Sequence, residues 1–73
     1  MKCIVKLVWD EETSHWFTET KDIPGLHLSS PSFDKLIEKV RMAAPELLEL
    51  NVDYTGPVHI IFEAERIEKG IAV

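Results

Sequence analysis

Only one stretch of this chain has the apolar spacing of an α-helix, and segments that alternate between apolar and polar residues lie on both sides of it. The apolar stripe consists of Phe33, Leu36, Ile37, Val40, Ala44, Leu47 and Leu48. These positions recur every three or four residues and therefore share one side of a helix. Ser32 is a typical N-cap, and Asp34 lies near the positive end of the helix dipole. Pro45 removes a backbone N–H, so we expect a kink there, or a break with Pro45 starting a second short helix, and an end near Asn51.

The segments around this helix have the character of strands. Residues 2–10 and 58–67 alternate with the period of two that a pleated backbone imposes. Residues 14–21 are rich in aromatic and β-branched side chains, and a polar loop of about four residues joins them to 2–10 as a hairpin. Pro24-Gly25 predicts a type II turn, with a short third strand at 26–29 after it.

The order strand-strand-strand-helix-strand favours one architecture. Because the helix separates the last two strands, the last strand can lie parallel to the first through a right-handed crossover, at the other edge of the sheet. We therefore expect an α+β fold of order β-β-β-α-β, with one helix packed on a four-stranded mixed sheet. The uncovered face would carry Ile4, Val8 and Trp16, or their neighbours in the alternation. Such an apolar face and open edge strands predict a homodimer or a higher oligomer.

The size and charge of the chain disfavour several functions. Its 73 residues include 8 Lys+Arg and 13 Asp+Glu, a net charge of -5, and we expect a single domain over residues 1–73. An acidic domain repels phosphate, which disfavours direct nucleic-acid binding. No run of about 18 apolar residues predicts a membrane span, and no signal-peptide core begins the chain. The single cysteine, Cys3, permits no internal disulfide, and the expected location is the cytoplasm.

The chemically reactive residues do not form the pattern of a catalytic or metal site. His15, His27 and His59 fall on three different predicted strands, without the short spacing of strong zinc sites. Asp10 and its acidic neighbours leave a metal-dependent nuclease as a minor alternative, because such sites need carboxylates that converge within a few ångströms. Cys3 lies on the apolar side of its strand, where a structural thiol is expected. We predict no enzyme, no metal and no cofactor.

Three aromatic residues near the first hairpin, Trp9, Trp16 and Phe17, allow two interpretations. The first is packing on the two faces of the sheet. The second is that the amphipathic indole of Trp16 anchors a protein interface, since tryptophan is enriched in binding hot spots.

The order of these motifs resembles a known family. A strand, an acidic turn and an aromatic strand precede Asp22-Ile23-Pro24-Gly25-Leu26, and Ser32-Phe33-Asp34-Lys35-Leu36 opens the helix. Over residues 2–68 this arrangement resembles the HicB-like antitoxin domain, in which a D-x-P-G-C motif and a short strand precede a capped helix. The chain departs from that pattern at Leu26, where cysteine is frequent, at Ser30-Pro31, where Gly-Asp is frequent, and at Leu36, where alanine is usual. The DNA-binding domain that follows in longer members has no counterpart in these residues, so autorepression is not implied.

The resemblance implies a partial ribonuclease H-like fold without catalytic carboxylates, and an antitoxin that sequesters a small basic toxin ribonuclease of the HicA type. An acidic surface would complement such a partner. The residues expected to contact it are Glu11, Glu12, Trp16, Glu19 and Asp22. The alternative is an orphan structural or regulatory domain that acts as a homo-oligomer.

Overall fold

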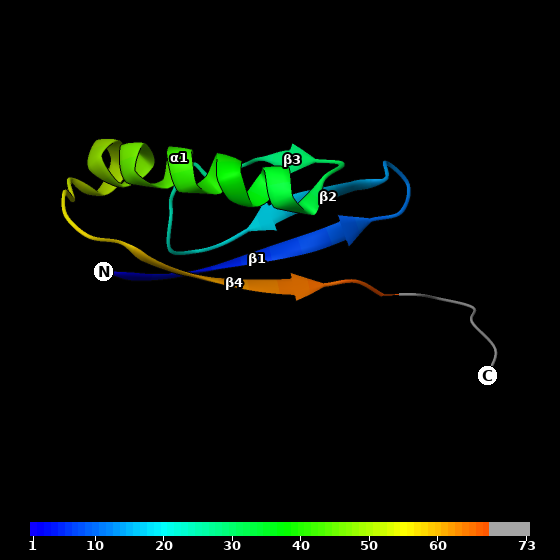
Figure 1. Cartoon of the computed structure of the whole chain (residues 1–73). Helices are drawn as coiled ribbons and strands as arrows, with labels where there is room; N and C mark the ends of the chain where they lie inside the picture. The colour runs from blue at the N-terminus through cyan, green and yellow to red at the C-terminus, as the bar shows by residue number, and fades with distance from the viewer. Residues whose placement is uncertain (68–73) are drawn as a thin grey trace.

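The structure, a computed structural model that describes residues 1–67, has one α-helix packed on one face of a four-stranded mixed sheet (Figure 1). The elements follow the chain as β1 (Lys2–Asp10), β2 (His15–Glu19), β3 (Ser29–Ser30), α1 (Phe33–Val52) and β4 (His59–Glu65). The strand order in the sheet is β3-β2-β1-β4, with β1 antiparallel to β2 and parallel to β4. The expected α+β architecture, with the last strand beside the first at an edge, is confirmed. Within residues 1–67, no helix combines the length and the apolar character that a bilayer crossing requires.

The core lies between α1 and the face of the sheet that it covers. Its fully buried side chains come from β1, the turn after β2, and α1. They are Cys3, Val5, Leu7, Ile23, Leu26, Leu36, Val40, Ala44 and Leu48. Ile60 and Phe62 of β4 and several partly buried apolar residues of α1 pack against this cluster. The alternation of β1 and the helical stripe therefore bury the sides that the sequence predicts.

Both ends of α1 are closed by local hydrogen bonds. The Ser32 hydroxyl accepts from the N–H of Lys35 at 3.3 Å, which confirms the predicted N-cap. At the other end Asp53 adopts a left-handed conformation with φ 55°, and the N–H of Tyr54 donates to the carbonyl of Leu48 at 3.1 Å. The left-handed residue and this bond close the C-terminal end of the helix. The helix ends at Val52, close to the expected end at Asn51.

The helix continues through Pro45, so of the two expected alternatives, a kink or a break with a second short helix, the break is wrong. Pro45 and Arg41 are both exposed, and water can bond the Arg41 carbonyl that the proline deprives of an N–H. On the opposite side Ala44 and Leu48 are fully buried and hold the helix against the sheet. Packing on the core side thus outweighs the proline penalty of roughly 3 kcal/mol.

The third strand lies at Ser29–Ser30 rather than at the expected 26–29. The reason is Thr18, whose buried side chain takes the place of a ladder partner. Its hydroxyl accepts from the N–H of Leu28 at 3.0 Å, and its own N–H donates to the Leu28 carbonyl at 3.0 Å. Residues 26–28 are therefore joined to β2 by hydrogen bonds to Thr18 alone. Regular strand pairing begins only where Phe17 faces Ser29.

The first hairpin has the expected four-residue loop, Glu11–Ser14. Strand β2 is shorter than the predicted 14–21 at both ends. Ser14 has φ 55° and belongs to the loop. Thr20, past the other end, uses its side chain to donate to the Ile4 carbonyl at 2.6 Å, so side-chain bonds replace the ladder there.

Candidate protein-binding face

The face of the sheet turned away from α1 is covered by no element within residues 1–67, and we call it the open face (Figure 1). Directly paired residues of neighbouring strands share a face, and faces alternate along each strand. The registers therefore assign it Lys2, Ile4, Lys6, Val8, Asp10, His15, Phe17, Glu19, Ser29, His59, Ile61, Glu63 and Glu65. In the part of the chain that the structure describes, it is the only broad surface of the sheet that α1 leaves available to a partner.

The middle of the open face is apolar. Ile4, Phe17 and Ile61 are 44, 37 and 40 % exposed. Ile4 faces Ile61 across the parallel ladder, and Val8 faces Phe17 across the antiparallel one. The expected apolar uncovered face is thus found. It carries Ile4 and Val8, as predicted, and Phe17 in place of its neighbour Trp16. Exposed apolar side chains gathered on one face are typical of interaction surfaces.

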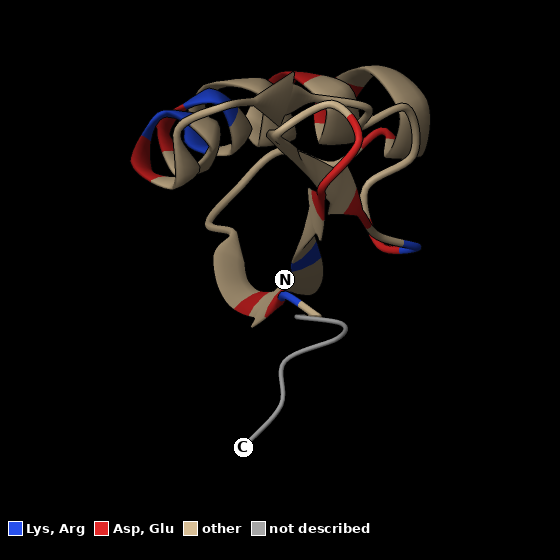
Figure 2. Cartoon of the chain, turned by 90° about the vertical axis from the view of Figure 1, so that its right-hand side faces the viewer, with Lys and Arg blue, Asp and Glu red and all other residues tan. Residues whose placement is uncertain are grey.

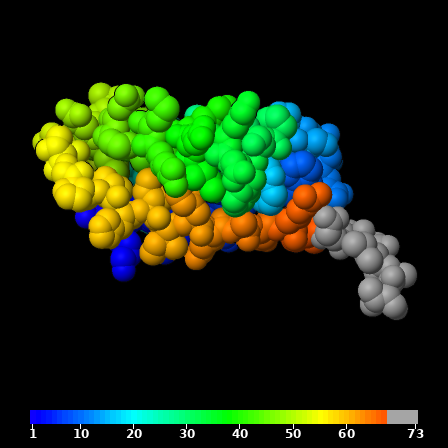
Figure 3. All heavy atoms as spheres, viewed as in Figure 1, coloured from blue at the N-terminus to red at the C-terminus, as the bar shows by residue number. Residues whose placement is uncertain are grey.

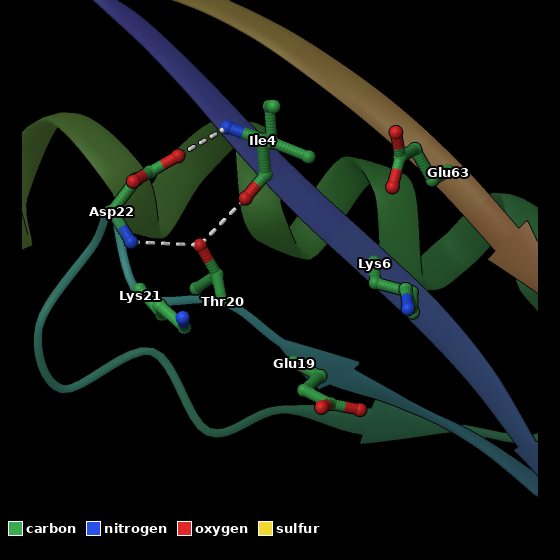
Figure 4. A pocket seen from close by; sticks show the side chains of 7 residues that line it. All are labelled: Ile4, Lys6, Glu19, Thr20, Lys21, Asp22 and Glu63. Atoms are coloured by element: carbon green, nitrogen blue, oxygen red, sulfur yellow. Dashed lines mark hydrogen bonds between the residues drawn. The ribbon is translucent and has the colours of Figure 1, made fainter.

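Carboxylates surround Lys6 at the centre of this face. Lys6 faces Glu19 on β2 and Glu63 on β4, and its Nζ lies 3.4 Å from the Glu65 Oε2. Figure 4 shows Lys6, Glu19 and Glu63 around a shallow hollow that also involves Ile4 and Asp22. Glu19, Glu63 and Glu65 outnumber Lys6 here, and Lys21 and Asp22 in the same hollow offset each other, so the centre of the open face is negative. Over the whole chain both signs occur on the helix and the sheet, with acidic residues in excess (Figure 2).

Asp22, one of the predicted contact residues, stabilises the fold by a hydrogen bond to the backbone of β1. Its Oδ2 accepts from the backbone N–H of Ile4 at 2.7 Å, while the Thr20 hydroxyl donates to the Ile4 carbonyl (Figure 4). The Asp22 N–H in turn donates to the Thr20 hydroxyl at 3.0 Å. Residues 20–22 therefore satisfy both backbone groups of Ile4 where β2 has ended.

The rest of the D-x-P-G motif also serves the fold. The N–H of Leu26 donates to the Ile23 carbonyl at 3.2 Å and Gly25 has φ 86°, which confirms the predicted type II turn. Ile23 is fully buried, and the side-chain amide of Asn51 donates to the Pro24 carbonyl at 2.9 Å. The turn is thereby tied to the end of α1. No local pattern in the sequence points to Asn51, because its partner is 27 residues away.

Trp16 lies on the covered face and packs in a row of aromatic rings. Its ring makes edge-to-face contacts with Trp9, at 5.3 Å between centroids, and with Phe33, at 4.9 Å. The guanidinium carbon of Arg66 lies 4.4 Å from the centre of the Trp9 ring. Such contacts agree with the packing interpretation of Trp16. A role for its exposed part in binding stays a prediction.

The five predicted contact residues do not form one cluster. Glu19 and Asp22 line the hollow near the start of β1. Glu11 and Glu12 are exposed in the hairpin loop, at the opposite end of β1, and border a second hollow beside Val8 and Glu65. Trp16 is on the other face. The open face collects instead the apolar residues and Glu63 and Glu65, which only the register of β4 brings there.

Two of the reactive residues, Cys3 and Asp10, contribute to the packing and hydrogen bonding of the fold. Cys3 is buried, and burial, with a smaller contribution from the negative charge of Asp22, raises the pKa of its thiol. The carboxylate of Asp10 accepts from the N–H of Glu12 at 3.1 Å and from the Thr13 hydroxyl at 3.0 Å, which shapes the hairpin loop. Within residues 1–67, no three His, Cys, Asp or Glu side chains gather as a metal ion would require.

Comparisons with known proteins give a family for this chain and a solved structure of similar fold. The crystal structure of the hypothetical protein TTHA1013 from the extremely thermophilic bacterium Thermus thermophilus is similar, with a TM-score of 0.81 and 35% sequence identity over 93% of this chain and 97% of that chain. No curated protein matches the sequence. Residues 2–72 match the family described as Domain of unknown function (DUF1902). The βββαβ chain with its open sheet face therefore belongs to the DUF1902 family.

Proposed function

We propose that this chain is a non-catalytic protein-binding domain of the HicB-like antitoxin type, which holds a small basic toxin ribonuclease of the HicA type on its open face, in the cytoplasm. The observation that carries the proposal is the composition of that face. Exposed Ile4, Phe17 and Ile61 supply apolar contact area. The carboxylates around Lys6 supply the charge that a basic partner complements.

The buried thiol and the shape of the loop support a binding role over a catalytic one. A thiolate nucleophile needs a lowered pKa and access, whereas burial raises the pKa of Cys3. Asp10, the first ligand of the nuclease alternative, already accepts two hydrogen bonds from its own loop.

The test begins with the reading frame beside this one in its genome. A small basic protein encoded there, with a single catalytic histidine, would be purified and titrated with the full chain by calorimetry. Its cleavage of RNA would be measured with and without the chain. We expect a stoichiometric complex and loss of cleavage. A candidate that neither binds nor loses activity, or a neighbouring frame that encodes nothing of this kind, would refute the proposal.

Charge-reversal variants test whether the open face is the surface that binds the toxin. Glu19→Lys with Glu63→Lys, which reverses the two carboxylates that face Lys6, should weaken the complex about tenfold, since exposed charge contacts contribute roughly 0.2–1 kcal/mol each and reversal turns attraction into repulsion. The control is Glu38→Lys with Glu46→Lys, which changes the net charge equally at exposed positions of α1. An equal loss in both variants would indicate long-range attraction without a defined face.

A domain whose function is its own oligomer is the second candidate. It is favoured by β4, which is an edge strand with exposed apolar residues. A stable homodimer that binds no basic neighbour would select this function over the first.

A further inference from the structure

Strand β4 presents a row of backbone groups that no residue in 1–67 bonds. The N–H of His59 donates to the Met1 carbonyl at 2.7 Å, so the backbone of His59 points toward β1. In a parallel ladder the N–H and C=O of one residue point to the same side, and successive residues alternate. Ile60, Phe62 and Ala64 therefore direct their N–H and C=O groups away from β1. Such an edge is a template for another strand.

The side chains of β4 are apolar on the side of α1 and mixed on the open face, where Ile61 lies between His59 and Glu63. Ile60 and Phe62 are only partly buried and Ala64 is exposed on the side of α1, because the helix approaches β2 and β3 most closely. Ile61 is 40 % exposed on the open face. In the space-filling view β4 (orange) is an uncovered ridge below α1 (Figure 3). Its seven residues include no proline or lysine, and the charges of β4, Glu63 and Glu65, both lie on the open face.

We propose that a second copy of this chain pairs with this edge, the two β4 strands running antiparallel about a twofold axis at Ile61. In this register Ile60 lies opposite the partner's Phe62, and Phe62 opposite the partner's Ile60. Their outward N–H and C=O groups can bond reciprocally, as antiparallel pairing requires. Ile61 meets the partner's Ile61 on the open face.

Charge favours this register over those shifted toward Glu63. His59 lies opposite the partner's Glu63, so that an imidazole N–H can donate to a carboxylate on each side of the axis. An axis at Glu63 would place that carboxylate opposite the partner's Glu63, which is destabilising. An axis at Phe62 would oppose Ile61 to the partner's Glu63 and lose the apolar pair. Of the axes at Ile61, Phe62 and Glu63, only the axis at Ile61 pairs β4 with itself in both charge and apolar contacts, as an isologous interface requires.

The pairing changes the open face as well as the edge. Directly opposed residues of antiparallel strands share a face, so the two open faces lie on the same side of one continuous sheet. The helices then lie together on the other side. The interface covers β4 and leaves Ile4, Val8 and Phe17 exposed. The proposed dimer does not depend on binding of a basic toxin.

The experiment measures the mass of the full chain by sedimentation equilibrium up to about 100 µM. We expect twice 8.4 kDa. Ile61→Lys places two ammonium groups across the axis and should raise the dimer dissociation constant at least about tenfold. Ile4→Lys is the matched control, because Ile4 faces Ile61 across the ladder and is similarly exposed. It should leave the dimer intact.

Mixing tests the register. Ile61→Lys and Ile61→Glu chains should each be weakened alone and should form a heterodimer together, since position 61 meets itself only in the proposed register. A monomeric parent chain would overturn the proposal. So would a dimer that survives Ile61→Lys, a dimer that Ile4→Lys also breaks, or a failure of the mixed chains to pair.

Discussion

Replacing Asp22 by alanine separates the structural task of this residue from its predicted contact with a partner. The substitution removes the acceptor 2.7 Å from the Ile4 N–H. A hydrogen bond to a charged group contributes roughly 1.5–3 kcal/mol, but the exposed Ile4 N–H can take a water molecule instead, which reduces the loss to about 1 kcal/mol. For a domain of this size that free energy corresponds to a drop in Tm of about 4–8 °C.

Asp22→Asn sharpens the assay, because its amide oxygen can still accept from Ile4 while the negative charge is lost. Urea unfolding followed by the fluorescence of Trp9 and Trp16 should place the Asn variant between the parent and the Ala variant. Glu11→Ala, an exposed loop carboxylate, is the control for loss of charge and should leave the midpoint unchanged. If Asp22→Ala unfolds at the same urea concentration as the parent, the structural argument for the motif is wrong.

Three further substitutions test other parts of the fold. Pro45→Ala restores an N–H for the Arg41 carbonyl in the exposed turn of α1 and should raise the free energy of unfolding by roughly 1–3 kcal/mol; an unchanged urea midpoint would contradict this. Gly25→Ala forces a Cβ at φ 86° to within 3.1 Å of the Asn51 Nδ2 and should lower the free energy of unfolding by about 1–2 kcal/mol, measured in the same assay. Burial raises the pKa of Cys3, so its stabilising contribution is complete below about pH 8.5, the ordinary thiol pKa, and is lost as pH rises toward the folded-state value. Cys3→Ala should flatten that alkaline decline in urea midpoint; an equally steep decline would assign it to other groups.

The elements that the sequence predicts well are those with a local cause. Alternation in residues 2–10 and the stripe from Phe33 to Leu48 need only one face to be buried, and both are found as expected. The third strand is misplaced because Thr18 bonds residues 26–28 through its side chain, a substitution that propensity does not reveal. The break at Pro45 is absent because burial of Ala44 and Leu48 outweighs a local penalty.

The residues of the open face could not be predicted without the register between β1 and β4. Glu63 and Ile61 come to lie beside Lys6 and Ile4 only because β4 pairs with β1 in one particular alignment. A shift by one residue would send both to the covered side. The predicted contacts at Glu19 and Glu12 could be chosen from charge alone, whereas the contribution of β4 could not.

In the D-x-P-G motif, on which the resemblance to HicB-like domains depends, Asp22, Ile23 and Gly25 each have a structural role. Asp22 bonds Ile4, Ile23 fills the core, and Gly25 forms a turn that Asn51 ties to α1. Chains that share this motif can therefore share a fold without sharing a partner. Under the proposed function, binding specificity is expected in residues that the fold does not need, above all the exposed apolar and acidic side chains of the open face. A chain that keeps the motif and exchanges Phe17 and Glu19 for those of a relative should retain its stability and change its partner.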